Sequence, residues 1–161
     1  MDFVSDRLVD GRRFRLLALV DNFPRVSPAL EADRSLTGRR VVEVLDRLVA
    51  RGIKPKSIHV DNGPEFISKA LDEWAYLNGV KLDFSRPGKP TDNAFIESFN
   101  GKLRTECLDQ HWFLSLQEAQ TTVENWRKEY NTDRLHTALG MKTPESFLAV
   151  WKQQKISHAS N

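Results

Sequence analysis

Residues 59–66 read HVDNGPEF and residues 89–104 read KPTDNAFIESFNGKLR. These two segments place the carboxylates of Asp61 and Glu97 with 35 residues between them. Asp61 directly follows a short apolar run at residues 58–60, and ligand sites of open α/β sheets gather at the carboxyl ends of strands. Glu97 falls on the helix expected next. One carboxylate at a strand end and a second on a following helix are what a protein needs to hold divalent metal ions against phosphate.

The helix that carries Glu97 has one polar face. Its polar side chains recur at offsets of four, three and four residues, which places them on the same side of a helix: Asn93, Glu97, Asn100 and Arg104. Apolar side chains occupy its other sides: Ala94, Phe95, Phe99 and Leu103. The polar face is therefore not expected to be core.

A third carboxylate should lie upstream, because two or three acidic side chains that converge on one spot suffice for Mg²⁺. Asp2 is the candidate, although spacing alone does not favour it over Asp6 or Asp21.

Length and composition indicate one globular domain. The chain has 161 residues, of which 40% are hydrophobic and 29% charged. We expect the domain to span residues 1–155 and residues 156–161 to form a disordered tail. The formal net charge of +2 neither requires nor excludes a nucleic-acid partner.

The single cysteine, Cys107, rules out an internal disulfide framework and a cysteine-rich zinc site. No apolar run approaches the roughly 18 residues of a spanning helix, and the first residues lack the apolar stretch of a signal peptide. These features predict a soluble, cytoplasmic protein.

The first part of the chain predicts antiparallel strands. Residues 1–4 are mostly apolar, residues 10–11 are a turn signal, and the apolar run at residues 14–20 fits a strand buried on both faces. A third strand is expected over residues 26–32, although Pro28 removes a ladder donor.

The rest of the chain alternates helices with strands. Helices are expected over residues 35–52 and 64–78, and strands over residues 58–60 and 80–84, which indicates a parallel portion of the sheet. The fold class is therefore α/β, with a mixed sheet and flanking helices.

Three further helices are expected after these strands. The first begins near Thr91 or Asp92, the second covers residues 115–129 behind a capping box of Ser115 and Glu118, and the third begins near Thr143.

Several motifs together resemble a known family. VDNGPEF begins at residue 60, NAFIESFNGKLRTECL at residue 93 and YNTDRLHTALGMKTP at residue 130. With the 35-residue spacing, they resemble the bacterial insertion-sequence transposases that have a DDE triad. The resemblance is closest to the second-frame product of the insertion sequence three group and more distant to retroviral integrase cores. It implies a ribonuclease-H-like fold, with a five-stranded mixed sheet of three antiparallel strands followed by two parallel ones.

By motif, the family's catalytic, metal-binding residues fall on Asp2, Asp61 and Glu97. The resemblance implies Mg²⁺ as cofactor, with Mn²⁺ as a substitute and two ions when DNA is bound. Further positions of the motifs give supporting residues and candidate DNA contacts: Asn62, Asn93 and Asn100 support the site, and Arg104, Lys102 and Lys89 contact DNA.

The activity implied is that of a Mg²⁺-dependent polynucleotidyl transferase, which cleaves DNA strands and transfers them in transposition or integration. Its partners would be transposon ends and target DNA. A homo-oligomer, at least a dimer, is implied for the active complex, in the cytoplasm and at the nucleoid of a bacterium. Arg134 and His136 are expected to pack the last helices onto the core.

The chain also departs from the family pattern. Leu135 replaces the usual proline and Pro24 the usual small hydroxyl residue, but neither belongs to the triad. Family members carry an upstream helix-turn-helix region, so the chain is expected to be either a fragment of a longer transposase or a decayed element. If Asp2 is not held beside Asp61, the alternative is a catalytically incomplete DNA-binding or self-associating fragment.

Overall fold

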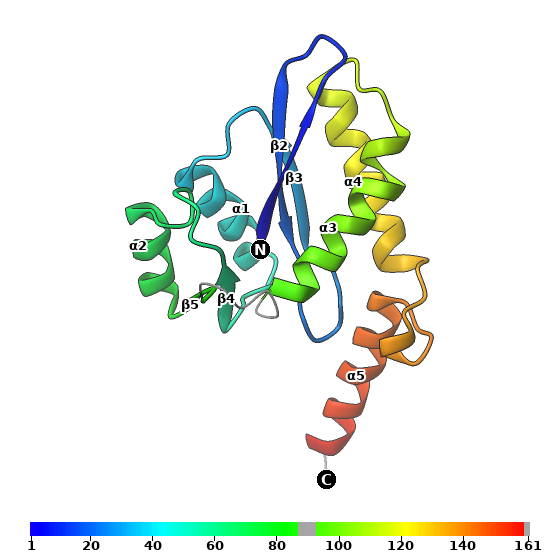
Figure 1. Ribbon diagram of the computed structural model, residues 1–161. Coiled ribbons are helices and arrows are strands. Elements are labelled where there is room, and N and C mark those ends of the chain that lie inside the picture. Colours follow the sequence, from blue (N-terminus) through cyan, green and yellow to red (C-terminus); the bar gives the residue numbers. More distant parts are fainter. Residues whose placement is uncertain (87–92, 160–161) are drawn as a thin grey trace.

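A computed structural model describes residues 1–86 and 93–159 of the chain (Figure 1). The strands are β1 (Asp2–Arg7), β2 (Arg13–Leu19), β3 (Ala29–Asp33), β4 (Ser57–Val60) and β5 (Lys81–Phe84). The α-helices are α1 (Gly38–Ala50), α2 (Lys69–Asn78), α3 (Ala94–Glu106), α4 (Leu116–Thr132) and α5 (Pro144–Ala159). Two short 3₁₀ helices, η2 (Leu108–Gln110) and η3 (Thr137–Leu139), follow α3 and α4. The α/β fold class expected from the sequence is confirmed.

The first three strands form an antiparallel sheet in the order β1-β2-β3. The central strand β2 is buried on both faces, as its apolar run predicted. Alternate residues of β2 belong to two different hydrophobic cores: Leu17 and Leu19 to one, Leu16 and Ala18 to the other. The turn that joins β1 to β2 contains Gly11, whose φ of 84° lies in the left-handed region that favours glycine.

Strands β4 and β5 form a parallel pair, with α2 as the connection between them. We expected one five-stranded sheet, but the described strands divide into two sheets. The start of β1 lies beside β4, where the ammonium group of Met1 donates a hydrogen bond to the carbonyl oxygen of His59 (2.7 Å). Because β1 begins at Asp2, the two sheets meet only at the start of this strand. Among the described strands, β1 and β4 form no ladder of backbone hydrogen bonds.

Helices cover both faces of the antiparallel sheet. Figure 1 shows α1 and α2 on one side of it and α3 and α4 on the other, while α5 extends away from the sheet. The core on the first side combines residues of β2 with residues of α1, α2 and β4, and the core on the second side combines β2 with α3 and α4. This arrangement places α3 next to β1, which positions the candidate site.

Two expected boundaries are wrong for a local reason. The third strand begins at Ala29 instead of residue 26, because Ser27 pairs its N–H and C=O with Asn131 and not with β2. The helix expected from Pro64 begins at Lys69, where the hydroxyl of Ser68 accepts a hydrogen bond from a helix N–H.

The remaining helices agree in position with those expected, with differences at their ends. The capping box is present, since the hydroxyl of Ser115 accepts from the N–H of Glu118 and the carboxylate of Glu118 accepts from the N–H of Leu114. The last helix, α5, ends at Ala159. The expected helix start at Thr91 or Asp92 lies outside the described residues. No helix of the described chain is long and apolar enough to cross a membrane.

Candidate metal centre

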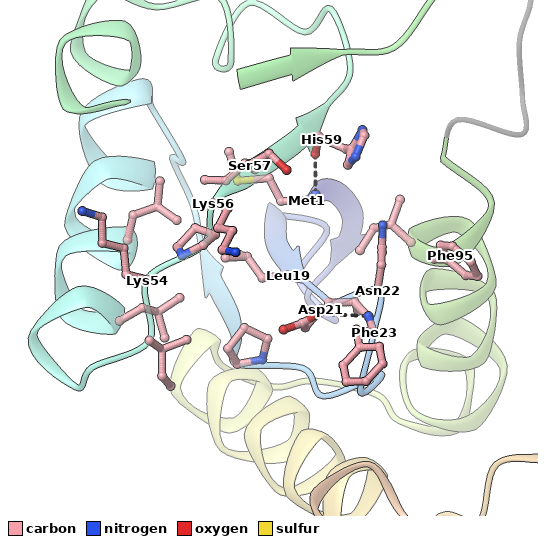
Figure 2. Close-up of a pocket in the computed structure, with 18 of the residues that line it drawn as sticks. Met1, Leu19, Asp21, Asn22, Phe23, Lys54, Lys56, Ser57, His59 and Phe95 are labelled. Atoms are coloured by element: carbon pink, nitrogen blue, oxygen red, sulfur yellow. Dashed lines mark hydrogen bonds between the residues drawn. The ribbon is translucent and has the colours of Figure 1, made fainter. Parts of the chain in front are cut away.

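Two of the three candidate carboxylates lie together. Asp2 is the first residue of β1, and Asp61 follows the last residue of β4. The hydrogen bond from Met1 to His59, drawn in Figure 2, holds these two strand ends beside each other. The carboxylates are close enough that the charge of Asp61 acts on Asp2. The structure therefore joins two residues that are 59 positions apart.

The environment of Asp2 disfavours its negative charge. Burial raises the pKa of Asp2, and the neighbouring charge of Asp61 raises it further. Hydrogen bonds from the N–H of Phe3 (2.7 Å) and from Nδ2 of Asn100 (2.7 Å) lower it, as does the Met1 ammonium, but the net pKa stays above its ordinary value. Two adjacent carboxylates of this kind gain stability from a cation between them.

The loop after Asp61 is built around its carboxylate. Oδ1 of Asp61 accepts a hydrogen bond from the N–H of Gly63 (2.9 Å). A Cβ atom at Gly63 would lie only 2.9 Å from the same oxygen, so a side chain at this position would require the Asp61 carboxylate to shift. Within the described residues, Oδ2 of Asp61 accepts no hydrogen bond, which leaves it open to a ligand.

The polar face of α3 is turned toward β1 and the end of β5. Oδ1 of Asn93 accepts a hydrogen bond from Oγ of Ser85 (2.9 Å), just after β5. About two turns further on, Asn100 contacts Asp2. At the far end of the helix, Nη2 of Arg104 donates to the carbonyl oxygen of Ser5 in β1 (2.8 Å). The three contacts fix the rotation of α3 about its axis.

Glu97 lies on this face between Asn93 and Asn100, in the first turn of α3, and its side chain is exposed. Among residues 1–86 and 93–159, no three His, Cys, Asp or Glu side chains are placed closely enough to hold a metal ion. The structure thus brings Asp2 and Asp61 together and directs the helix face of Glu97 toward them without placing its carboxylate in the same cluster.

The oxygen atoms around Asp2, Asp61 and Asn100 fit a hard divalent cation. Oδ1 of Asn100 is buried and has no hydrogen-bond partner, although Nδ2 of the same side chain donates to Asp2. A buried acceptor without a donor is costly unless something positive satisfies it. With the carboxylates of Asp2 and Asp61 beside it, the donor set is made of oxygen atoms, which Mg²⁺ and Mn²⁺ prefer.

An apolar cavity of about 370 Å³ adjoins the carboxylates but is a separate feature (Figure 2). It lies between the end of β2, strand β4 and the start of α3, and Met1 forms part of its wall. Its lining is mainly apolar, with Leu19, Ile58 and Ile96 among its residues, and Asp61 does not contribute to it. The cavity is thus not the place where the candidate ligands meet.

The candidate DNA contacts have different surroundings. Arg104 holds α3 to β1 and lies 3.8 Å from a carboxylate oxygen of Asp109. Nζ of Lys102 donates to Oγ of Ser98, one turn earlier on α3 (2.9 Å). Lys89 lies outside the described residues. Asn62, a supporting candidate, is exposed and donates to the carbonyl oxygen of Ser85 (3.2 Å).

Sequence reasoning missed Ser85. Its hydroxyl contacts both the carbonyl oxygen of Val60 (3.1 Å) and Asn93 (2.9 Å), so it links the strand that ends before Asp61 to the start of α3. No periodicity or spacing distinguishes a single serine at the end of a strand, and only the pairing of β4 with β5 brings it to this place.

The fold is that of retroviral integrase catalytic cores. The chain matches the simian T-cell lymphotropic virus intasome in complex with PP2A regulatory subunit B56 gamma with a TM-score of 0.75, at 20% identity over 89% of this chain and 50% of that one. It matches the catalytic core domain of BIV integrase with a TM-score of 0.69, at 15% identity over 96% of each chain. The ribonuclease-H-like, α/β fold class expected from the sequence is therefore confirmed, whereas the single five-stranded sheet is not.

Two family profiles, both described as integrase core domain, match the chain, one over residues 1–90 and the other over residues 78–144. The chain therefore belongs to the integrase core domain family. It is 46% identical over 149 residues to an uncharacterized 31.7 kDa protein of insertion element IS407 from Burkholderia multivorans. It is 26% identical over 135 residues to transposase InsF for insertion sequence IS3A from Escherichia coli. The expected resemblance to transposases of the insertion sequence three group is confirmed.

The alignments cover most of this chain and part of each relative. They include 92% of this chain and 54% of the IS407 protein, and 82% of this chain and 47% of InsF. The chain thus spans about half the length of the curated relatives that it matches.

Proposed function

We propose that this chain is the catalytic core of a DNA-recombining enzyme that cleaves DNA strands and transfers them to a new site. The observation that carries this proposal is the adjacency of Asp2 and Asp61 at two strand ends, with the polar face of α3 packed against them. Membership of the integrase core domain family supports the same reaction class.

In this proposal Asp2, Asp61 and Glu97 are the ligands of two Mg²⁺ ions when DNA is bound, and Mn²⁺ can replace Mg²⁺. Such ions, when bound, favour attack on a phosphodiester and stabilise the leaving oxygen. Water or a DNA 3′-hydroxyl attacks the phosphorus in line, a new P–O bond forms, and the opposite P–O bond breaks to release the leaving oxygen. A solved neighbour, the HTLV-2 integrase catalytic core domain, is described in complex with magnesium.

The neighbouring residues have distinct tasks. Asn100 orients Asp2 by a hydrogen bond, and Asn93 and Asn62 connect the start of α3 and the loop of Asp61 to Ser85. Glu97 is one helical turn before Asn100 on the same face. Bound cations would attract its exposed carboxylate toward Asp2 and Asp61, which would complete the ligand set.

DNA is the proposed partner, both as transposon ends and as target. Lys102, Arg104 and Lys89 are the proposed phosphate contacts. The solved neighbours include an intasome and dimeric and trimeric forms of an integrase core, and we infer at least a dimer in the active complex of this protein. We also infer that the two sheets act as one five-stranded layer, joined where Met1 contacts His59.

The proposal is tested by cleavage of an end-labelled duplex that carries the ends of the parent insertion element, with Mg²⁺ or Mn²⁺ present. Glu97→Gln should abolish cleavage and leave the thermal unfolding midpoint unchanged, because Glu97 is exposed and contributes no described packing. Glu73→Gln, at an exposed position of α2 on the other side of the sheet, is the matched control and should cleave normally.

Retained cleavage in Glu97→Gln would overturn the assignment. The second candidate, a catalytically incomplete fragment that binds DNA or itself, predicts a different result. In that case the unmodified chain binds the duplex but shows neither Mn²⁺ binding that depends on Asp2 and Asp61 nor metal-dependent cleavage.

A further inference from the structure

Four side chains form a ring of contacts between the antiparallel sheet and the loop that follows Asp61. Arg15 lies on β2 and Phe3 on β1, whereas Glu65 and Phe66 lie in the loop. The guanidinium of Arg15 forms an ion pair with the carboxylate of Glu65, 50 residues away, and lies over the ring of Phe3, 4.3 Å from its centre. The ring of Phe3 stacks on that of Phe66, with ring centres 4.7 Å apart. We call these four residues the Arg15 cluster.

The contacts of the Arg15 cluster are largely shielded from water. Phe66 is fully buried in the core that the sheet forms with α1 and α2. The side chains of Arg15 and Glu65 are only 32% and 21% exposed. Burial raises the pKa of Glu65, but hydrogen bonding, chiefly from Arg15, and the charge of Arg15 bring it below its ordinary value. Because salt screens a partly buried ion pair less than an exposed one, this pair holds its two segments together.

A tight turn connects this attachment to Asp61. The N–H groups of Phe66 and Ile67 both donate to the carbonyl oxygen of Gly63 (3.0 Å each). The N–H of Gly63 in turn donates to Oδ1 of Asp61 (2.9 Å). A Cβ atom at Gly63 would lie 3.4 Å from Oε2 of Glu65, so the Glu65 carboxylate lies close to this turn. The orientation of the Asp61 carboxylate therefore depends on where Glu65 and Phe66 are held.

The same cluster is attached to Asp2 at its other end. Phe3 directly follows Asp2 on β1, and its N–H donates to Oδ1 of Asp2 (2.7 Å). The ring of Phe3 contacts both Arg15 and Phe66. The cluster is thus a second attachment between the strand of Asp2 and the segment of Asp61, in addition to the hydrogen bond between the chain's ammonium group and β4.

We propose that Arg15 and Glu65 are positioning residues, whose ion pair sets the place of the Asp61 carboxylate relative to Asp2. They act through the loop and do not bind the metal ion themselves. The proposal rests on the function proposed above, because it gives the two residues a role in metal binding by Asp2 and Asp61. Metal affinity depends on how firmly the ligands are held, so a loosened loop should bind metal more weakly.

An effect of charge alone would make the two residues act in opposite directions. The negative charge of Glu65 attracts a cation, whereas the positive charge of Arg15 repels it. Removal of Arg15 would then strengthen metal binding. If the ion pair acts by position, removal of either residue weakens metal binding, and removal of both causes little further loss.

The first test is calorimetric titration of the chain with Mn²⁺ in the absence of DNA. Arg15→Met and Glu65→Leu should each weaken Mn²⁺ binding by about 10-fold, and the double variant by about the same factor. Glu65→Gln, which can still accept a hydrogen bond from Arg15, should stay within about threefold of the unmodified chain. Tighter binding in Arg15→Met, equal losses in Glu65→Gln and Glu65→Leu, or unchanged affinity in all variants would overturn the proposal.

Arg47→Met is the matched control for the loss of an ion pair. Arg47 on α1 pairs with Glu31 on β3 (2.6 Å), so this pair also joins the sheet to another element. It lies on the far strand of the sheet, separated from β1 by β2. The Mn²⁺ affinity of Arg47→Met should equal that of the unmodified chain. A loss as large as that of Arg15→Met would show a general effect and contradict the positioning role.

The second test needs neither metal nor DNA. Hydrogen exchange of the Gly63, Phe66 and Ile67 amides is followed by NMR in the metal-free chain. All three N–H groups are hydrogen-bonded within the loop, so they should exchange about 10-fold faster or more in Glu65→Leu. Unchanged exchange would show that the loop is held without the ion pair, which contradicts the proposal.

The two proposals fail separately. If the unmodified chain shows no Mn²⁺ binding that depends on Asp2 and Asp61, the proposed function fails, and hydrogen exchange still decides whether the ion pair holds the loop. If the chain binds Mn²⁺ and cleaves DNA but neither measurement responds to Glu65→Leu, the function stands and the positioning role fails. If Arg15→Met does not fold, the comparison of Glu65→Leu with Glu65→Gln gives the answer.

Discussion

At the scale of single residues, the interaction between Asn100 and Asp2 controls the candidate metal centre. The side chain of Asn100 donates to Oδ2 of Asp2, which is the contact that most directly orients this carboxylate from another element. Residues that orient metal ligands typically affect metal affinity by about 10–100-fold.

We therefore predict that Asn100→Leu weakens Mn²⁺ binding by about 10–100-fold in calorimetric titration, because Asp2 loses a donor and its pKa rises further. Asn125→Leu, at an exposed position of α4, is the control for a general effect of removing an amide. Affinity within twofold of the unmodified chain in Asn100→Leu would show that Asp2 does not bind the ion.

Cys107 provides a residue-scale test of packing. It is buried at the end of α3, and burial raises the pKa of its thiol to about 11. A raised pKa means that the reactive thiolate is scarce at pH 8, by about two orders of magnitude relative to a free cysteine. Reaction with a disulfide reagent at pH 8 should be slow in the folded chain and fast in denaturant. Equal rates would show that the second hydrophobic core is open.

The candidate ligands could be predicted from the sequence, whereas their supporting contacts could not. Asp61 and Glu97 stand in motifs with a fixed spacing, so both candidates can be recognised from the sequence alone. Ser85 stands in no pattern. Its role arises from a hydroxyl that contacts Asn93 and the carbonyl oxygen of Val60, and it depends on where other elements lie.

At the scale of elements, α4 fixes the loop between β2 and β3 at Ser27. The side chain of Asn131 is buried and pairs with both backbone groups of Ser27: Oδ1 accepts from the N–H (2.8 Å) and Nδ2 donates to the C=O (2.9 Å). Arg127 donates to the same carbonyl oxygen (2.6 Å). The loop is therefore attached to α4 at one residue.

Asn131→Ala should destabilise the chain by about 1–3 kcal/mol in urea unfolding, because it leaves the buried N–H of Ser27 without a partner and removes one of the two donors to its C=O. Asn125→Ala on the exposed side of α4 should leave the free energy of unfolding unchanged. A loss below about 0.5 kcal/mol for Asn131→Ala would show that this attachment does not hold the loop.

Element boundaries were predictable where one signal dominates. Gly11 and the apolar run of β2 both indicate the same hairpin, and no second turn signal nearby indicates a different one. The start of α2 was misplaced because two start signals compete, Pro64 and Ser68. Ser68 prevails since its extended backbone lets its hydroxyl cap the helix. The start of β3 was misplaced because a partner 104 residues away occupies Ser27.

At the scale of the whole molecule, the fold brings distant carboxylates to one edge. The antiparallel strands supply Asp2, the parallel pair supplies Asp61, and α3 crosses the junction. The antiparallel portion followed from the opening hairpin in the sequence, and the parallel portion followed from the later alternation of helices with strands. The division into two sheets did not, because it depends on how far β1 extends beside β4.

The central claim is that Asp2, Asp61 and Glu97 together bind divalent metal. It is tested most directly by anomalous diffraction from crystals of the chain bound to DNA and Mn²⁺. We predict a manganese peak coordinated by carboxylate oxygens of Asp2 and Asp61, with Glu97 turned inward to coordinate manganese at the same centre. A map with no peak between these strand ends, or with manganese bound elsewhere while Glu97 stays in solvent, would contradict it.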